Sequence, residues 1–325
     1  MLQCTAALAA VLAAMVTAAV AGPLASSKRG LVFTPNETTP ADDTIWVTKP
    51  TDLTWYYNYQ GSPASPFSNI PQSQFEFVPM LWGAPSSLDD TTFLTTVKSL
   101  VKDKGINITH VLTFNEPDGT YANGGSNIQP SAAAQVWVNN IVPLQTMGIR
   151  VGLPACTGGS TGIPWLQSFL SQCSKLVSTG GRTQNCTYDF LTIHWYGNFE
   201  GLASHMGEYS AAFPNKTMWI TEYNVDNQDL ATTQTFYNTS ADYFDRLDIV
   251  ERYSYFGAFR SDVSNVGPNG AMLSSDGSLT DIGAWYLGRQ ATGVKRTQGS
   301  LGFRSVIPQG TTAALTAVLA IVLLL

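Results

Sequence analysis

Two segments of the chain resemble buried strands that carry a glutamate at the end. One reads Val111-Leu-Thr-Phe-Asn-Glu116 and the other reads Met218-Trp-Ile-Thr-Glu222. Both are rich in apolar, β-branched and aromatic residues, which is typical of strands. Glycoside hydrolysis uses two carboxyl groups, of which one protonates the leaving oxygen and the other attacks the sugar carbon. The two segments therefore predict Glu116 as the acid/base and Glu222 as the nucleophile.

Polar residues beside these glutamates suggest supporting roles. Asn115 directly precedes Glu116, and its amide could donate to the 2-hydroxyl of a sugar. His194 and Tyr196 follow an apolar segment, and either one could hydrogen-bond Glu222 and orient it. For His194 the alternative is a core histidine with its hydrogen bonds satisfied.

Aromatic residues near the ends of other apolar segments are candidate sugar platforms, because the C–H bonds of a sugar ring can stack on an aromatic face. Any single one of them could instead belong to the core, but the set predicts at least one platform. The set comprises Trp55, Tyr57, Tyr59 and Trp82, and additional candidates on the same grounds are Tyr223, Asn224 and Phe259.

The elements that must position these residues alternate between strand-like and helix-like segments. Strands alternating with helices indicate βαβ units, and eight such strands favour a closed (β/α)8 barrel in a single α/β domain over residues 30–292. Glu116 then ends the fourth strand and Glu222 the seventh, so the two side chains face each other across the active-site end. The predicted strands are 30–34, 52–59, 75–82, 110–114, 150–154, 190–195, 218–222 and 252–258, and the predicted helices are 87–104, 131–147, 163–177, 202–213, 229–247 and 281–289.

The composition limits the classes of ligand. Charged residues make up 12% of the chain and the net charge is −6, which argues against a nucleic-acid partner because such partners require a basic surface. Only 3 His are present and they lack metal-ligand spacing, so we expect no metal site. We also expect no cofactor, because glycoside hydrolysis needs only two carboxyl groups and water. A surface with few charges suits a neutral polar ligand such as a sugar.

The cysteines predict one disulfide. Of the 4 Cys, Cys4 lies in the N-terminal apolar segment, which leaves three. Cys173 and Cys186 flank a polar segment and are expected to pair, while Cys156 follows an apolar strand and is expected to be a buried free thiol.

The N-terminal segment has the pattern of a secretory signal. Residues 1–22 contain a short, alanine-rich apolar segment and end in an Ala-Val-Ala cleavage pattern before Gly22. Lys28 and Arg29 follow, and this dibasic pair is either a processing site or an exposed pair of charges.

The C-terminal segment 293–325 ends in an apolar tail with nothing after it. A membrane span needs about 20 apolar residues, and this tail is shorter. A short terminal tail behind small residues such as Gly299, Ser300 and Gly302 fits a GPI-attachment signal, and the alternative is a short tail anchor. We expect a secreted protein at the cell surface or cell wall that contacts the membrane only through a lipid anchor. Sequons at Asn36, Asn107, Asn185, Asn215 and Asn238 agree with secretion.

Six motifs together resemble the fungal members of glycoside hydrolase family 128, the alkali-sensitive-linkage-type glycosyl hydrolases. The motifs begin at Gly30, Trp55, Phe77, Phe114, Asp189 and Trp219, and they fall in family order over about residues 30 to 290. The resemblance implies a barrel that acts as a retaining endo-β-1,3-glucanase, with Glu116 as acid/base and Glu222 as nucleophile.

Three hypotheses for the function remain open. The leading one is a monomeric, wall-associated enzyme that hydrolyses β-1,3-glucan by double displacement. A transglycosylase would pass the same covalent intermediate to a sugar instead of water. A non-catalytic glucan-binding surface protein is the third, and the presence of both glutamates disfavours it.

Overall fold

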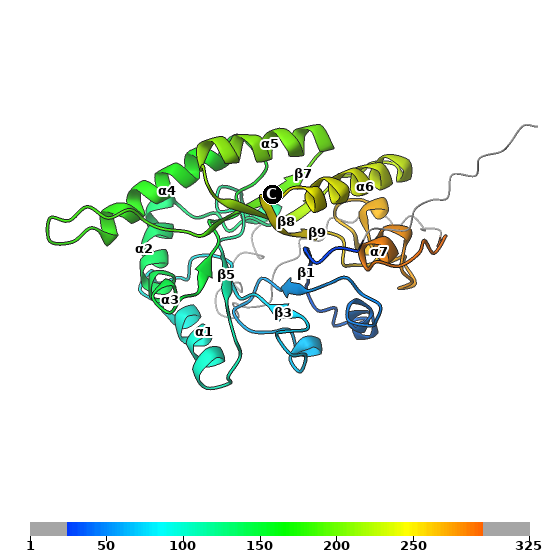
Figure 1. Ribbon diagram of the computed structural model, residues 1–325, viewed down its shortest axis with the longest axis horizontal. Helices are drawn as coiled ribbons and strands as arrows, with labels where there is room; N and C mark the ends of the chain where they lie inside the picture. Colours follow the sequence, from blue (N-terminus) through cyan, green and yellow to red (C-terminus); the bar gives the residue numbers. More distant parts are fainter. Residues whose placement is uncertain (1–24, 295–325) are drawn as a thin grey trace, which may run out of the picture.

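The computed structural model describes residues 25–294 (Figure 1). The predicted signal at 1–22 lies outside the described residues, and so does the C-terminal segment apart from residues 293 and 294. Within the described part of the chain, no helix combines the length and the apolar character needed to cross a membrane.

Within residues 25–294, nine strands form the centre of the fold, and every pairing between them is parallel. They are arranged in two sheets with the orders β3-β2-β1-β9-β8-β7 and β4-β5-β6. The strands are β1 (Arg29–Val32), β2 (Trp55–Tyr57), β3 (Glu76–Phe77), β4 (Met80–Leu81), β5 (His110–Thr113), β6 (Arg150–Val151), β7 (Phe190–Tyr196), β8 (Thr217–Asn224) and β9 (Val250–Tyr255).

Two local contacts connect the sheets. The segment predicted as one strand at 75–82 forms the two short strands β3 and β4, because Pro79 between them has no N–H to donate. The Val78 N–H donates to β2 at Tyr56, and the Pro79 carbonyl accepts from β5 at Leu112. On the other side of β6, a parallel bridge joins Gly152 to the first residue of β7, Phe190.

Helices lie outside the strands (Figure 1), so the chain has an α/β fold with parallel strands. The α-helices are α1 (Thr92–Lys102), α2 (Pro130–Asn140), α3 (Val142–Gln145), α4 (Gly162–Val177), α5 (Phe199–Ala212), α6 (Leu230–Arg246) and α7 (Asp281–Tyr286). Short 3-10 helices lie at η1 (Pro40–Trp46), η2 (Ser65–Phe67), η3 (Tyr121–Asn123), η4 (Ser261–Val263) and η5 (Pro268–Gly270).

Local residue types explain where the helices begin and end. The side chain of Asn198 caps α5 by accepting from the Gly201 N–H, and Asp229 caps α6 in the same way at Thr232. The helix predicted at 131–147 is divided into α2 and α3, because Pro143 cannot donate the hydrogen bond that a continuous helix requires there.

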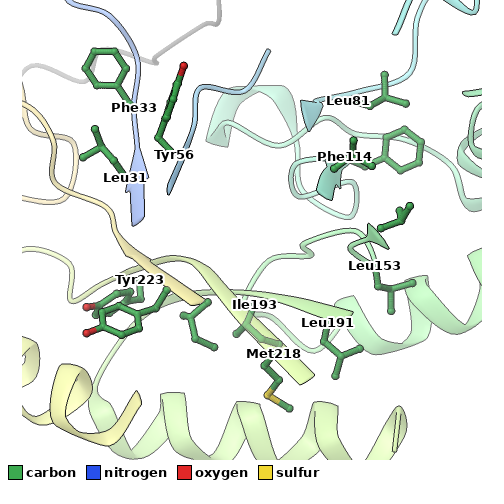
Figure 2. Close-up of a cluster of buried hydrophobic side chains, with 14 of the residues drawn as sticks. Leu31, Phe33, Tyr56, Leu81, Phe114, Leu153, Leu191, Ile193, Met218 and Tyr223 are labelled. Carbon is green, nitrogen blue, oxygen red and sulfur yellow. The ribbon is translucent and has the colours of Figure 1, made fainter. Parts of the chain in front are cut away.

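The apolar interior forms two clusters that the strand alternation separates. The large cluster joins strand residues such as Leu31, Tyr56 and Leu191 to the helices, and in Figure 2 the labelled side chains point away from the middle of the view. The small cluster takes the intervening strand positions, and its members are Val32, Trp55, Tyr57, Val78, Met80, Leu112, Phe190 and Trp219. Each strand therefore has one face toward the helices and one toward the other strands.

The dibasic pair is neither an exposed pair of charges nor an accessible processing site. Arg29 is the first residue of β1, is 2% exposed and pairs with Asp52 at 3.0 Å. The Lys28 ammonium donates to three carbonyls at the end of α6, those of Phe244, Asp245 and Leu247. Both cations are bound to the fold, so a protease could reach this peptide bond only after local unfolding.

The cysteine prediction is confirmed. Cys173 on α4 and Cys186 form a disulfide, and Cys156 is a buried free cysteine. The disulfide ties α4 to the segment that leads into β7.

Candidate active site

The fold brings Glu116, His194 and Glu222 together. One atom of each side chain lies within 4.8 Å of the others. The Nδ1 atom of His194 is 3.1 Å from Oε1 of Glu116 and 3.6 Å from Oε2 of Glu222. The imidazole thus lies between two carboxyl groups that are 106 residues apart in the chain (222 − 116).

Three tyrosine hydroxyls donate to Glu222. Tyr59 donates to Oε1 at 2.7 Å, Tyr196 donates to Oε2 at 2.5 Å, and Tyr57 approaches Oε1 at 3.3 Å. Because a hydroxyl hydrogen bond to an ionised group is stronger than one to a neutral group, this arrangement favours the carboxylate form of Glu222.

A β-bulge in β8 turns Glu222 toward this cluster. Ile193 of β7 pairs with Ile220, but the next residue of β7, His194, pairs with Glu222, so Thr221 is the extra residue. The hydroxyls of Tyr57 and Ser254 donate to the Thr221 carbonyl and hold the bulge in place. With strict alternation Glu222 would share the helix-facing side of Ile220, so the bulge is what places its carboxyl group beside His194.

Glu116 lies in a turn just beyond β5. Its N–H donates to the Ala155 carbonyl at 2.7 Å, and its own carbonyl accepts from Gly119. Its φ is +43°, a left-handed conformation that non-glycine residues adopt at an energetic cost of about 1–3 kcal/mol. The Asp118 carboxylate stabilises this turn by accepting from the N–H and hydroxyl of Thr157 and from the hydroxyl of Thr161.

Burial and charge act in opposite directions on the ionisation of this cluster. Burial and the Glu116 charge raise the pKa of Glu222 by more than His194, Tyr196 and Tyr59 lower it, so the net pKa of Glu222 is raised. Burial lowers the pKa of His194, but the two glutamates outweigh it, so the net pKa of His194 is raised. The pKa values of Tyr57, Tyr59 and Tyr196 are well above the usual range because of burial and the Glu222 charge, so these residues remain hydroxyl donors.

The donor types would also suit a metal ion, but the geometry favours hydrogen bonding. Both oxygens of Glu222 already accept from tyrosine hydroxyls, and His194 Nδ1 lies within hydrogen-bonding distance of Glu116. Among the residues that the structure describes, the other imidazole nitrogen of His194, Nε2, is buried without a hydrogen-bond partner. We therefore assign no metal to this cluster.

The predicted aromatic residues fall into two groups. Tyr59 and Tyr196 are partly buried and reach Glu222, and Trp82 is partly buried and stacks on Tyr121 with the ring centroids 6.4 Å apart. Trp55, Tyr57 and Tyr223 are 1%, 0% and 0% exposed, so none offers an open face to a sugar. For these three the platform prediction is wrong.

The reasons for burial differ among the three. Trp55 packs against Tyr57 and Trp219 between the strands, and its indole N–H donates to the Lys28 carbonyl. Tyr57 is equally buried but still contributes its hydroxyl to Glu222. Tyr223 follows the bulge and points to the helix side, where its ring meets Phe244.

Asn115 is 5% exposed, and its amide N–H₂ donates to the Gly124 carbonyl at 3.1 Å. Its side-chain oxygen is buried without a hydrogen-bond partner within the described residues. The amide thus ties the turn at Glu116 to the segment around η3.

Sequence reasoning missed two aromatic residues at this end of the strands. Tyr121 is 63% exposed and follows Glu116 by five positions in the sequence. This short separation could have identified it as a candidate for the site. Phe256 is partly buried, directly follows β9 and contacts the rings of Tyr196 and Phe259. Its proximity to Tyr196 arises from strand pairing that no local sequence signal indicates.

The family described as glycosyl hydrolase catalytic core matches residues 30–286. A curated relative, alkali-sensitive linkage protein 1 of Schizosaccharomyces pombe, is 31% identical over 271 residues, which cover 81% of this chain and 44% of the relative. The chain thus spans less than half the length of that relative.

Solved structures of glycoside hydrolase family 128 members have the same fold. An endo-β-1,3-glucanase of Pseudomonas viridiflava is 24% identical with a TM-score of 0.63, covering 82% of this chain and 99% of its own. A curdlan-specific exo-β-1,3-glucanase of Blastomyces gilchristii, solved with glucose, is 25% identical with a TM-score of 0.60, covering 81% and 98%. An oligosaccharide-binding protein of Cryptococcus neoformans is 24% identical with a TM-score of 0.59, covering 82% and 96%.

The family match extends over most of the described chain and includes Glu116, His194 and Glu222. It agrees with the motifs that the sequence shares with the fungal members of this family. The protein therefore belongs to the glycosyl hydrolase catalytic core family, within glycoside hydrolase family 128.

Proposed function

We propose that this protein is a retaining endo-β-1,3-glucanase that cleaves cell-wall glucan by double displacement. The observation that carries the proposal is that one carboxyl oxygen of Glu116 and one of Glu222 lie within 4.8 Å of each other. Retaining glycosidases place their two carboxyl groups about 5–5.5 Å apart, whereas inverting enzymes leave about 6.5–9.5 Å for a water molecule.

The chemistry needs only these two groups and water. In the first step a Glu222 oxygen attacks the anomeric carbon while the bond from that carbon to the glycosidic oxygen breaks. The electron pair of that bond stays on the oxygen, which takes a proton from Glu116. In the second step a water molecule gives a proton to Glu116 and attacks the same carbon, which releases Glu222 and a sugar with its original configuration.

The groups around Glu222 support its role as the nucleophile. Three tyrosine hydroxyls donate to it and stabilise a carboxylate, whereas no tyrosine hydroxyl of the described chain donates to Glu116, which faces His194. The His194 imidazole contacts both carboxyl groups. It is placed to hold Glu222 in position for attack and to adjust the charge of Glu222 as the proton on Glu116 leaves and returns.

We infer that the fold is a (β/α)8 barrel. If β3 and β4 count as one interrupted strand, the described chain has eight parallel strands. The strand pairings, together with the Gly152–Phe190 bridge between β6 and β7, then connect these eight strands into a closed ring. Glu116 then follows the fourth strand and Glu222 lies in the seventh. This is the active-site end of such barrels.

The substrate class rests on the relatives. Of the three solved family members named above, two are β-1,3-glucanases and the third is described as an oligosaccharide-binding protein. Non-catalytic binding is therefore the second candidate function, and the complete cluster of Glu116, His194 and Glu222 favours catalysis over it. We propose endo action because the aromatic contacts Trp82–Tyr121 and Phe256–Phe259 lie in different loops after the strands, so that a glucan chain could extend on both sides.

The signals at the ends of the chain complete the proposal. A secretory signal at 1–22 and a GPI-type signal at 293–325 would place a catalytic domain of residues 30–292 at the cell surface or wall. We propose that it works there as a monomer.

The direct test is release of reducing sugar from laminarin, curdlan, β-1,6-glucan and mixed-linkage glucan. Wild-type protein should act on the β-1,3-linked substrates, and Glu116→Gln and Glu222→Gln should each lower kcat by at least about 1,000-fold. Glu200→Gln is the matched control, because Glu200 is an exposed glutamate on α5 and should leave activity unchanged. Glucan binding without turnover by the wild type would establish the binding function instead.

A further inference from the structure

We propose that Tyr121, stacked on Trp82, binds the leaving-group sugar and so also the sugar acceptor in transglycosylation. The inference rests on the proposed function, because it uses Glu116 as the acid that protonates the leaving oxygen. It adds a residue that the sequence motifs do not include and assigns a direction to the substrate chain.

Tyr121 is an unusual surface residue. It is 63% exposed, whereas most aromatic side chains of the described chain are buried. Its ring lies beside that of Trp82, with the centroids 6.4 Å apart and the planes at 30°, and it keeps an exposed aromatic face. Such a face suits the C–H side of a pyranose ring.

The backbone links this pair directly to Glu116. The Trp82 carbonyl accepts from the N–H of Asn115, the residue before Glu116, at 2.8 Å. On the other side of the loop, the Asn115 amide donates to Gly124, which ends the 3-10 helix that carries Tyr121. Trp82 and Tyr121 therefore both adjoin the segment that holds Glu116.

The loop that carries Tyr121 is held close to Glu116 by a glycine. A Cβ atom on Gly125 would lie 2.7 Å from the Glu116 carbonyl oxygen, closer than a methyl group can approach. Hydrogen bonds from Gly119 to Glu116 and from Gly125 to Thr120 fix the same loop. The position of Tyr121 relative to Glu116 is thus set by the backbone, as a binding platform requires.

The direction of the substrate follows from the two carboxyl groups. The sugar that becomes attached to Glu222 must lie against Tyr59 and Tyr196, the two partly buried tyrosines that donate to that carboxylate. The oxygen that Glu116 protonates lies on the other side of the broken bond, so the next sugar extends toward the loop of Tyr121. In transglycosylation a sugar hydroxyl occupies that place, gives its proton to Glu116 and attacks the carbon held by Glu222.

The test compares two substrates that differ in the leaving group. The leaving group of laminaripentaose is a sugar. The leaving group of β-laminaribiosyl fluoride is a fluoride ion, which provides no sugar to contact Tyr121. Tyr121→Ala should lower kcat/KM for laminaripentaose about threefold to tenfold and leave fluoride release unchanged. It should also lower the ratio of transfer products to hydrolysis products at high oligosaccharide concentration.

Two controls separate the ring from general effects. Tyr121→Phe keeps the aromatic face and should behave as the wild type with both substrates. Leu176→Ala removes an exposed apolar side chain on α4 and should also leave both rates unchanged. An equal loss with both substrates, or no loss with laminaripentaose, would overturn the proposal.

If wild-type protein cleaves neither substrate, the glucanase proposal fails and the platform is judged by binding alone. Calorimetry with laminarihexaose then compares the wild type with Tyr121→Ala. Weaker binding by the variant upholds a sugar contact at Tyr121, and equal affinity overturns it.

Discussion

At the scale of the residue, the hydrogen bonds of Glu222 are the feature that most affects the chemistry. Burial raises the pKa of this carboxyl group, and Tyr196 and Tyr59 are among the groups that lower it. The 2.5 Å contact from Tyr196 is the shortest of the three tyrosine contacts. Removing one of these hydroxyls should therefore raise the pH at which Glu222 becomes ionised.

The Tyr196→Phe variant tests this role. Loss of the donor raises the pKa of Glu222, and because the nucleophile must be ionised, the acidic limb of the kcat/KM profile should move to higher pH. The rate at its optimum should fall about 10- to 100-fold, as for loss of a hydrogen bond to a charged group. A pH–rate profile of both proteins measures the two effects.

Tyr223→Phe is the matched control. Tyr223 directly follows Glu222 in sequence, but its ring points to the helices and, within the described chain, its hydroxyl has no hydrogen-bond partner. This variant should keep the wild-type profile. An unshifted profile for Tyr196→Phe would show that its hydroxyl does not set the ionisation of Glu222.

The same residues show what the sequence could predict at this scale. Glu116 and Glu222 stand out because each ends an apolar segment, and the structure places them together. Tyr223 was expected at the same end, yet it points away, because the bulge at Thr221 and the alternation of the strand are consequences of pairing with β7. Register between strands depends on contacts distant in sequence, so a local pattern cannot supply it.

At the scale of the element, each of the eight predicted strands has a counterpart, but two predicted elements are interrupted. Pro79 separates β3 from β4, and Pro143 separates α2 from α3. Both interruptions could have been predicted, because proline lacks the N–H that a strand or helix uses. The 3-10 helices carry no comparable periodicity and were not predicted.

A polar network connects the beginnings of several strands. Glu76 of β3 accepts from His110 of β5 at 3.0 Å and from Arg252 of β9 at 2.7 Å. The guanidinium of Arg252 also lies 4.3 Å from the ring centroid of Trp219 on β8. Burial tends to raise the pKa of Glu76, but His110 and Arg252 outweigh it and lower the pKa to about 2 from 4.5.

This network predicts a specific loss of stability in acid. Because the folded-state pKa of Glu76 is depressed, its contribution is fully present above about pH 4.5 and is lost as the pH falls toward 2. Between pH 6 and pH 3 the wild type should lose about 2 kcal/mol of unfolding free energy more than Glu76→Gln. Urea denaturation at both pH values measures the difference.

The control for this prediction is Asp242→Asn, which removes a carboxyl group from an exposed pair with Arg246 on α6. This variant should lose as much stability in acid as the wild type. Equal losses in wild type and Glu76→Gln would contradict the assignment of the effect to Glu76.

At the scale of the whole molecule, Arg29 connects the beginning of the domain to its end. Its guanidinium pairs with Asp52, lies 3.8 Å from Asp245, and donates to the Trp285 carbonyl of α7. It stands on β1, which pairs with both β2 and the last strand, β9. The sequence marked this residue only as half of a dibasic pair, since its partners are up to 257 residues away.

The Arg29→Met variant should therefore be strongly destabilised. Removing one partner of a buried ion pair leaves carboxylates without their counter-charge, and the expected loss of unfolding free energy at pH 7 is about 3–5 kcal/mol. Arg246→Met is the control, because its side chain is 67% exposed and should cost no more than about 1 kcal/mol. Similar stability of the two variants in urea would contradict the structural role of Arg29.

The distance between Glu116 and Glu222 predicts that the reaction retains the anomeric configuration, and a single measurement can test this prediction. Proton NMR during the first minutes of laminarin-oligosaccharide hydrolysis reports the anomeric configuration of the product before it equilibrates. Double displacement between two carboxyl groups with one oxygen each within 4.8 Å of the other predicts that the β-anomer appears first and the α-anomer follows only by mutarotation. Initial appearance of the α-anomer would contradict Glu222 as a nucleophile.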